Sequence, residues 1–109
     1  MEMLQDPILD KIKVQLVKEF HPTRLFLYGS RANGTHREDS YYDFVMVLPE
    51  FDRKNRFELM QRVSTRLWAE LNVEVQVWAY SQEEFELRKD DFSSIPETAM
   101  NTGMEIALG

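Results

Sequence analysis

The sequence predicts a mixed α/β (α+β) fold, in which helices pack on a small mixed sheet. Three observations lead to this prediction. Apolar residues recur at helical spacing over residues 6–20 and 55–71. Short apolar runs over residues 24–28, 42–47 and 73–78 have the length and residue types of strands. The two kinds of segment alternate along the chain, and this order is typical of a sheet covered by helices.

The composition fits one domain over residues 1–109. Of these residues 43% are apolar and 12% aromatic, which is enough for a modest core. The chain has no cysteine, so a disulfide framework and thiolate metal sites are excluded. No apolar run approaches the roughly 20 residues that span a bilayer, and the opening residues MEMLQD lack the basic start of a signal peptide. We therefore expect a soluble, cytoplasmic protein without a membrane partner.

The net charge of −6 argues against nucleic acid as a partner, because sequence-independent binding normally needs a concentrated basic surface. A polymerase-like role on long nucleic acid is therefore disfavoured. Acidity is compatible with binding a nucleoside triphosphate, because a bound divalent cation supplies positive charge locally. It also suits a basic protein partner, although acidity that serves only solubility is the simpler explanation.

The first element is a helix that begins after Asp6. Asp6 followed by Pro7 is typical of an N-cap with proline in the first helical turn, and the helix ends before Pro22. Its apolar stripe consists of Ile8, Leu9, Ile12, Leu16, Val17 and Phe20. A strand over residues 24–28 then delivers the chain to Gly29.

The centre of the chain carries an acid inside an apolar strand. Residues 32–40 form a polar, turn-rich loop, and the strand at 42–47 follows it with Asp43 among apolar neighbours. Strand alternation places Tyr41 and Asp43 on one face. Because a buried ionised carboxylate is costly without a cation or hydrogen-bond donors, Asp43 should lie near a strand end beside a partner.

A second long helix is predicted over residues 55–71, because apolar residues follow helical spacing there. Its stripe consists of Phe57, Met60, Val63, Leu67 and Leu71, with Trp68 beside them. The third strand, 73–78, alternates three valines with Glu74, Gln76 and Trp78. This alternation places a second acid, Glu74, inside a strand.

Capping signals define the last elements. Ser81 with Glu84 is typical of a capping box that opens a short helix. Pro96 opens another helix, which Gly103 closes. Residues 104–108 are expected to add a short last strand.

The motif around Gly29 resembles that of a known family. Gly29-Ser30, a ten-residue spacer and the pair at positions 41 and 43 are similar to the signature of the minimal nucleotidyltransferases (MNT) of the DNA polymerase beta superfamily, which is Gly-Ser, ten residues, then Asp-any-Asp. The flanking residues that also resemble the family are Leu27, Tyr28, Arg31, Ala32, Gly34, Ser40, Phe44 and Val45. The resemblance covers roughly residues 5–108 and implies the polymerase-beta-type nucleotidyltransferase core.

The resemblance implies a nucleotide-binding role for the turn. Gly29 and Ser30 would hold the triphosphate of the bound nucleotide, since a glycine permits close backbone approach and consecutive N–H groups bind anions. Arg31 would add a charge-assisted contact to phosphate. The alternative for Arg31 is a surface residue paired with Glu38 or Asp39.

Two carboxylates match catalytic positions of the family. Asp43 matches the second motif aspartate, which helps hold the magnesium ions. Glu74 matches the third carboxylate, which also contributes to the metal site and acts as base toward the attacking hydroxyl. The alternative for Glu74 is an exposed strand face or edge, where acids are common.

Tyr41 is the departure from the family pattern, because it stands where the family has its first aspartate. A phenol is a neutral and poor magnesium ligand at neutral pH, its unperturbed pKa being about 10. Three explanations stay open: a natural inactive member, a tyrosine substituted into an active parent, and a register shift that hides another ligand. Asp39, two residues upstream, lies before the predicted strand and is a poor substitute.

The resemblance implies a Mg²⁺-dependent enzyme that transfers a nucleoside monophosphate, AMP from ATP, onto a hydroxyl acceptor. Small members of the family resemble the antitoxin half of HEPN/MNT toxin–antitoxin pairs, which adds AMP to a tyrosine of the HEPN toxin. The alternative, favoured by Tyr41, is a non-catalytic binding module of the same fold that acts through complex formation with a protein partner. A homo-oligomer is also compatible with the sequence.

Overall fold

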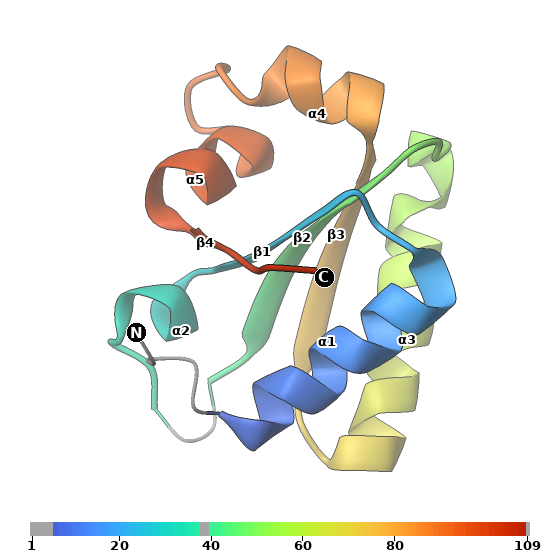
Figure 1. The fold of residues 1–109 in the computed structure, drawn as a ribbon, viewed down its shortest axis with the longest axis vertical. Helices are drawn as coiled ribbons and strands as arrows, with labels where there is room; N and C mark the ends of the chain where they lie inside the picture. The colour runs from blue at the N-terminus through green and yellow to red at the C-terminus, as the bar shows by residue number, and fades with distance from the viewer. Residues whose placement is uncertain (1–5, 38–39, 109) are drawn as a thin grey trace.

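The computed structural model describes residues 6–37 and 40–108, which fold around a four-stranded sheet of order β3-β2-β1-β4 (Figure 1). Strand β1 is antiparallel to β2 and to β4, whereas β2 and β3 are parallel. The predicted mixed α/β class is therefore confirmed. The elements are α1 (Pro7–Phe20), β1 (Arg24–Tyr28), α2 (Ser30–Asn33), β2 (Tyr42–Leu48), the 3-10 helix η1 (Arg53–Asn55), α3 (Arg56–Leu71), β3 (Val75–Ser81), α4 (Gln82–Arg88), α5 (Ile95–Thr102) and β4 (Met104–Glu105).

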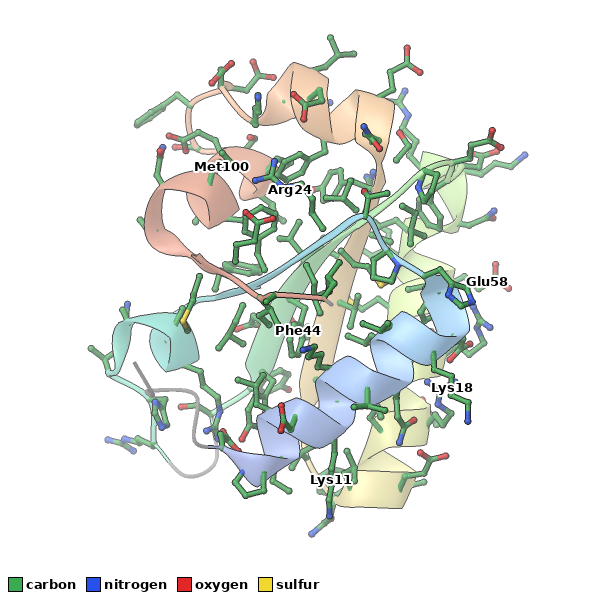
Figure 2. The ribbon with its side chains drawn as sticks, in the orientation of Figure 1. Lys11, Lys18, Arg24, Phe44, Glu58 and Met100 are labelled. Atoms are coloured by element: carbon green, nitrogen blue, oxygen red, sulfur yellow. The ribbon has the colours of Figure 1, made fainter. Side chains whose placement is uncertain are left out.

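Different helices cover the two faces of the sheet (Figure 1). Helices α1 and α3 cover one face, where their buried aliphatic side chains pack with Phe44, Met46 and Val77. Figure 2 shows Phe44 at the centre of the molecule, close to α1. Helices α4 and α5 cover the other face and contribute Phe85 and Ala99 to a second, smaller core.

Helices α4 and α5 leave one end of their face uncovered. In Figure 1 they lie over the end of the sheet where β2 and β3 finish, and α2 lies at the opposite end. Strand register and alternation place Tyr28, Asp43 and Gln76 on this face, near the start of β2 and β3. All three side chains are partly exposed. We call this part of the sheet the site face.

The predicted helix starts are confirmed by their capping bonds. Asp6 Oδ1 accepts the backbone N–H groups of Ile8 and Leu9 at 3.0 and 3.2 Å. Ser81 Oγ accepts the N–H of Glu84 at 3.0 Å. These bonds satisfy N–H groups that have no partner inside α1 and α4, which explains why both helices begin where the sequence predicts.

Helix α3 spans the predicted range, but its buried stripe differs from the predicted one. Leu59, Val63 and Leu67 are buried, whereas Phe57 is 69% exposed and Trp68 is 52% exposed. The buried residues follow one another at intervals of four, so they form a narrow stripe that faces the sheet. Leu59 rather than Phe57 therefore anchors the start of α3.

The third strand is Val75–Ser81 and not 73–78, so it begins and ends later than predicted. Helix α3 ends with Asn72 in a left-handed conformation, and the next two residues carry the chain across to β2 before parallel pairing begins. The prediction that Glu74 lies inside a strand is therefore wrong. Glu74 directly precedes β3.

The last elements agree with their predicted signals. Helix α5 begins with Pro96 in its first turn and is closed by Gly103, whereas β4 (Met104–Glu105) covers only the first two residues of the last strand predicted over 104–108. Over residues 6–37 and 40–108, no helix combines the length and apolarity needed to cross a membrane.

Candidate functional site

Gly29 brings the backbone of its turn against the Asp43 carboxylate. Tyr28, the last residue of β1, pairs with Asp43, and Gly29 follows with φ 80° and ψ −158°. This conformation is almost restricted to glycine. A Cβ built on Gly29 would lie 3.0 Å from Asp43 Oδ2. The turn therefore needs glycine for its conformation and for the space beside the carboxylate.

Ser30 begins the short helix α2 directly after this contact. The Gly29 carbonyl accepts the N–H groups of Ala32 and Asn33 at 3.0 and 3.3 Å, and the Ser30 carbonyl accepts that of Thr35 at 3.0 Å. The turn is thus closed by its own backbone. Ser30, the second residue of the Gly-Ser motif, is partly exposed in this turn.

Asp43 occupies a poorly hydrated position. It is half-buried as the second residue of β2, and burial raises its pKa above the ordinary value of an aspartate because the charged form loses hydration. Burial, together with the charge of Asp43, also raises the pKa of the neighbouring Tyr28 phenol. The two side chains therefore share an environment of low polarity at the Gly29 turn.

Asp43→Asn is expected to stabilise the fold at pH 7. A carboxyl whose pKa is raised by folding binds its proton more tightly in the folded state, so the free energy of unfolding falls as pH rises through the folded pKa. The amide lacks this ionisation, and its advantage should vanish near pH 3, below the unfolded pKa of about 3.9. Thermal melts at pH 7 and pH 3 measure this difference.

The matched control is Asp91→Asn at an exposed position, where little change is expected. A lower melting temperature for Asp43→Asn at pH 7 would mean that interactions of the Asp43 carboxylate outweigh its lost hydration.

Tyr41 and Glu74 are joined at the edge of the site face. The Tyr41 phenol lies beside the Glu74 carboxylate, and hydrogen bonding between them is the main cause that raises the pKa of Tyr41. The backbone supports the pair, because the N–H of Tyr42 donates to the Glu74 carbonyl at 2.9 Å. Tyr41 is 44% exposed. The carboxylate that the resemblance assigns as base thus has a neutral donor of the same chain beside it.

Arg31 turns toward the loop after α2. Its Nε donates to the Ser40 carbonyl at 3.1 Å and its Nη2 to the Arg37 carbonyl at 3.4 Å. Its guanidinium carbon lies 3.9 Å from the ring centroid of Tyr42, a side chain of the α1–α3 core. These contacts place Arg31 beside the opposite face from Asp43. The alternative partners of Arg31 at residues 38 and 39 lie outside the described residues.

A cavity of about 420 Å³ lies beside Glu74. The half-exposed Trp68 and the helix-ending Asn72 line it together with Glu74, and further lining residues are Arg31 and Tyr42. Glu74 therefore borders this cavity as well as the site face.

The described residues do not fit a two-cation centre. Among them, no group of three or more histidine, aspartate or glutamate side chains is arranged to hold a metal ion. Asp43 and Glu74 are two of the three expected carboxylates, and Tyr41 takes the place of the third. Asp39, the possible substitute, lies outside the described part of the chain.

Two residues of the site face were missing from the sequence-predicted site. Tyr28 is opposite Asp43 in the antiparallel register, and Gln76 is opposite Asp43 in the parallel register. Tyr28 has a signal in the sequence, because it is the last residue before the Gly-Ser motif. Gln76 has a weaker one, because strand alternation places it on the same face as Glu74, but its place beside Asp43 depends on where β3 begins to pair with β2.

Comparisons with known proteins identify the fold and the family. A search of curated proteins found no significant match. A mutant of the toxin–antitoxin MntA-HpeT is similar in structure, with a TM-score of 0.55 and 18% identity over 88% of this chain and 69% of that chain. A toxin–antitoxin solved with AMP-PNP has a TM-score of 0.57 and 17% identity over 88% of this chain and 70% of that chain. At such identities the likeness shows the fold.

The sequence profile described as polymerase beta, nucleotidyltransferase, matches residues 10–94. This range is most of the chain and contains the Gly29 turn, Asp43 and Glu74. The chain therefore belongs to the polymerase beta nucleotidyltransferase family.

Proposed function

We propose that this chain is a minimal nucleotidyltransferase that binds a nucleoside triphosphate at the Gly29 turn and transfers its monophosphate, AMP from ATP, to a hydroxyl of a partner protein. Tyr41 strongly reduces the rate of this transfer. The observation that supports the proposal best is the contact of Gly29 with Asp43 on the uncovered end of the sheet. We also propose that residues 1–109 form one domain and that the protein acts in the cytoplasm.

The nucleotide side of the site is the Gly29 turn. Gly29 has no side chain to hinder a phosphate, and Ser30 adds a partly exposed hydroxyl. Arg31 follows in the same turn, but its side chain lies beside the opposite face, where its contacts hold the following loop. A structural neighbour of the chain is a toxin–antitoxin solved with AMP-PNP, which supports an adenine nucleotide as the ligand.

The acceptor side of the site is Glu74. In the family, bound magnesium ions neutralise the negative charge of the phosphates. Within this chain, the Glu74 carboxylate would take the proton of the acceptor hydroxyl, since it borders both the site face and the cavity beside Trp68. Tyr41 competes with that acceptor, because its phenol already donates to Glu74.

We propose a HEPN-type toxin as the partner and one of its tyrosines as the acceptor. Both reported structural neighbours are toxin–antitoxin proteins, which supports a protein partner. The cavity beside Glu74 has room for an aromatic side chain, and the half-exposed Trp68 offers a ring for it to pack against.

A second candidate function is complex formation without chemistry. The Tyr41–Glu74 hydrogen bond favours it, because it occupies the predicted base and leaves a neutral side chain at a ligand position. In this case the partner should bind equally well with and without ATP, and Asp43→Ala should leave the complex intact.

The test compares ATP binding by calorimetry, with Mg²⁺ present, in the unchanged chain and in Tyr41→Asp. Tyr41→Asp should bind ATP at least about tenfold more tightly, or about 1.4 kcal/mol, because it supplies the missing carboxylate and releases Glu74. Radiolabel from the α-phosphate of ATP should then appear on a HEPN-type toxin.

Tyr41→Phe is the matched control, because it also releases Glu74 but adds no ligand. An equal gain in Tyr41→Phe would assign the effect to the hydrogen bond alone. No ATP binding and no label with Tyr41→Asp would reject nucleotidyl transfer in favour of complex formation.

A further inference from the structure

We infer that two neutral side chains, Tyr41 and Gln76, prevent the site face from binding a divalent cation strongly. Position 76, rather than position 74, is where a third carboxylate would complete a cation site with Asp43. This inference rests on the proposed function, and it changes what is needed to restore it. Tyr41→Asp alone would restore part of the binding of nucleotide and cation, and a carboxylate at position 76 would supply the rest.

The parallel register of β2 and β3 places Gln76 beside Asp43. In this parallel pair, Tyr42 lies beside Val75 and Asp43 lies beside Gln76. Paired residues on neighbouring strands are about 4.8 Å apart and point to the same side of the sheet. Gln76 is therefore the β3 side chain directly beside Asp43, and it is partly exposed on the site face.

Glu74 belongs to the preceding row of the same face. It lies one residue before the paired segment, and continuing the register by one residue places it beside Tyr41, in agreement with the hydrogen bonding between their side chains. Successive rows of one face are two residues apart, or about 6.6 Å along the strand. Positions 41, 43, 74 and 76 therefore form a rectangle. The acids Asp43 and Glu74 lie on one diagonal, and the neutral residues Tyr41 and Gln76 lie on the other.

This arrangement separates the negative charges. A divalent cation is bound most strongly where several carboxylate oxygens converge on one point. Beside Asp43, β3 offers the neutral amide of Gln76. The Glu74 carboxylate lies one row away and is held by Tyr41. Because both rows contain a neutral residue, neither row supplies a pair of carboxylates.

The test measures Mn²⁺ binding in the Tyr41→Asp background, by loss of the electron paramagnetic resonance signal of free Mn²⁺. Adding Gln76→Asp should tighten Mn²⁺ binding at least about tenfold, whereas adding Glu74→Gln should weaken it less than about threefold. Gln76→Asn is the matched control for side-chain length and should leave the affinity unchanged. Circular dichroism melts verify folding, and Gln76→Glu replaces any aspartate variant that does not fold.

The opposite ranking would overturn the inference: loss of Mn²⁺ binding on Glu74→Gln, with no gain on Gln76→Asp. Absence of Mn²⁺ binding in every variant would overturn it as well. The proposed function is judged separately by ATP binding and partner labelling. Mn²⁺ binding with the expected ranking, but without ATP binding, would support the inference and reject the function.

Discussion

Gly29→Ala is expected to lower the free energy of unfolding by about 2–4 kcal/mol. The backbone conformation at φ 80° and ψ −158° costs a non-glycine residue roughly 1–3 kcal/mol. A methyl group 3.0 Å from Asp43 Oδ2 adds crowding against the Asp43 side chain. For a chain of this size the melting temperature should fall by at least about 10 °C, as measured by calorimetry.

The same substitution should damage the site. In the Tyr41→Asp background, Gly29→Ala should weaken ATP binding at least about tenfold, measured at a temperature where the variant remains folded. Gly34→Ala is the matched control: Gly34 also has a positive φ of 81°, but a Cβ there meets nothing within 4 Å. It should cost only about 1 kcal/mol and leave ATP binding unchanged. Equal losses in both variants would show that contact with Asp43 is irrelevant.

Phe44→Ala is expected to cost about 3–5 kcal/mol, the usual range for removing a fully buried phenylalanine. Phe44 has no exposed surface and lies in the core that α1 and α3 share with the sheet. Small proteins have total stabilities of about 5–15 kcal/mol, so this variant should be close to unfolding. Urea denaturation followed by circular dichroism should show a much lower midpoint at an unchanged slope.

Phe92→Ala is the control for this variant, because Phe92 is 91% exposed and its loss should change stability by less than about 0.5 kcal/mol. A loss below about 1 kcal/mol for Phe44→Ala would mean that the core between α1 and the sheet relaxes into the space of the missing ring.

The helices were predictable because their signals are local. Asp6 and Ser81 cap the helices that follow them, and Pro96 and Gly103 delimit α5, as the sequence indicates. The buried side of α3 was less accessible, because Phe57, Leu59 and Met60 all have apolar side chains. Which of them faces the sheet depends on how α3 sits on β3.

In the candidate site, likewise, the parts with local sequence signals were predictable. The Gly-Ser motif placed Gly29 near Asp43, and the structure places these two residues close together, so that a side chain on Gly29 would meet the Asp43 carboxylate. The nucleotide and metal roles of Gly29, Ser30, Asp43 and Glu74 remain predictions. The direction of Arg31 depends on the ring of Tyr42, and the place of Gln76 depends on strand register. Neither of these can be read from neighbours in the sequence.

The parallel pairing of β2 with β3 also determines when the site can form during folding. The Gly29 turn and Asp43 belong to an antiparallel pair that is close in sequence, so this half can assemble early. Gln76 comes to lie beside Asp43, with Glu74 one row away, only after the chain has passed through the whole of α3 and β3 has paired with β2. Closing this crossover is a non-local step, which makes the acceptor side of the site the late-forming half. Nucleotide contacts at the turn should consequently appear before the complete site during refolding.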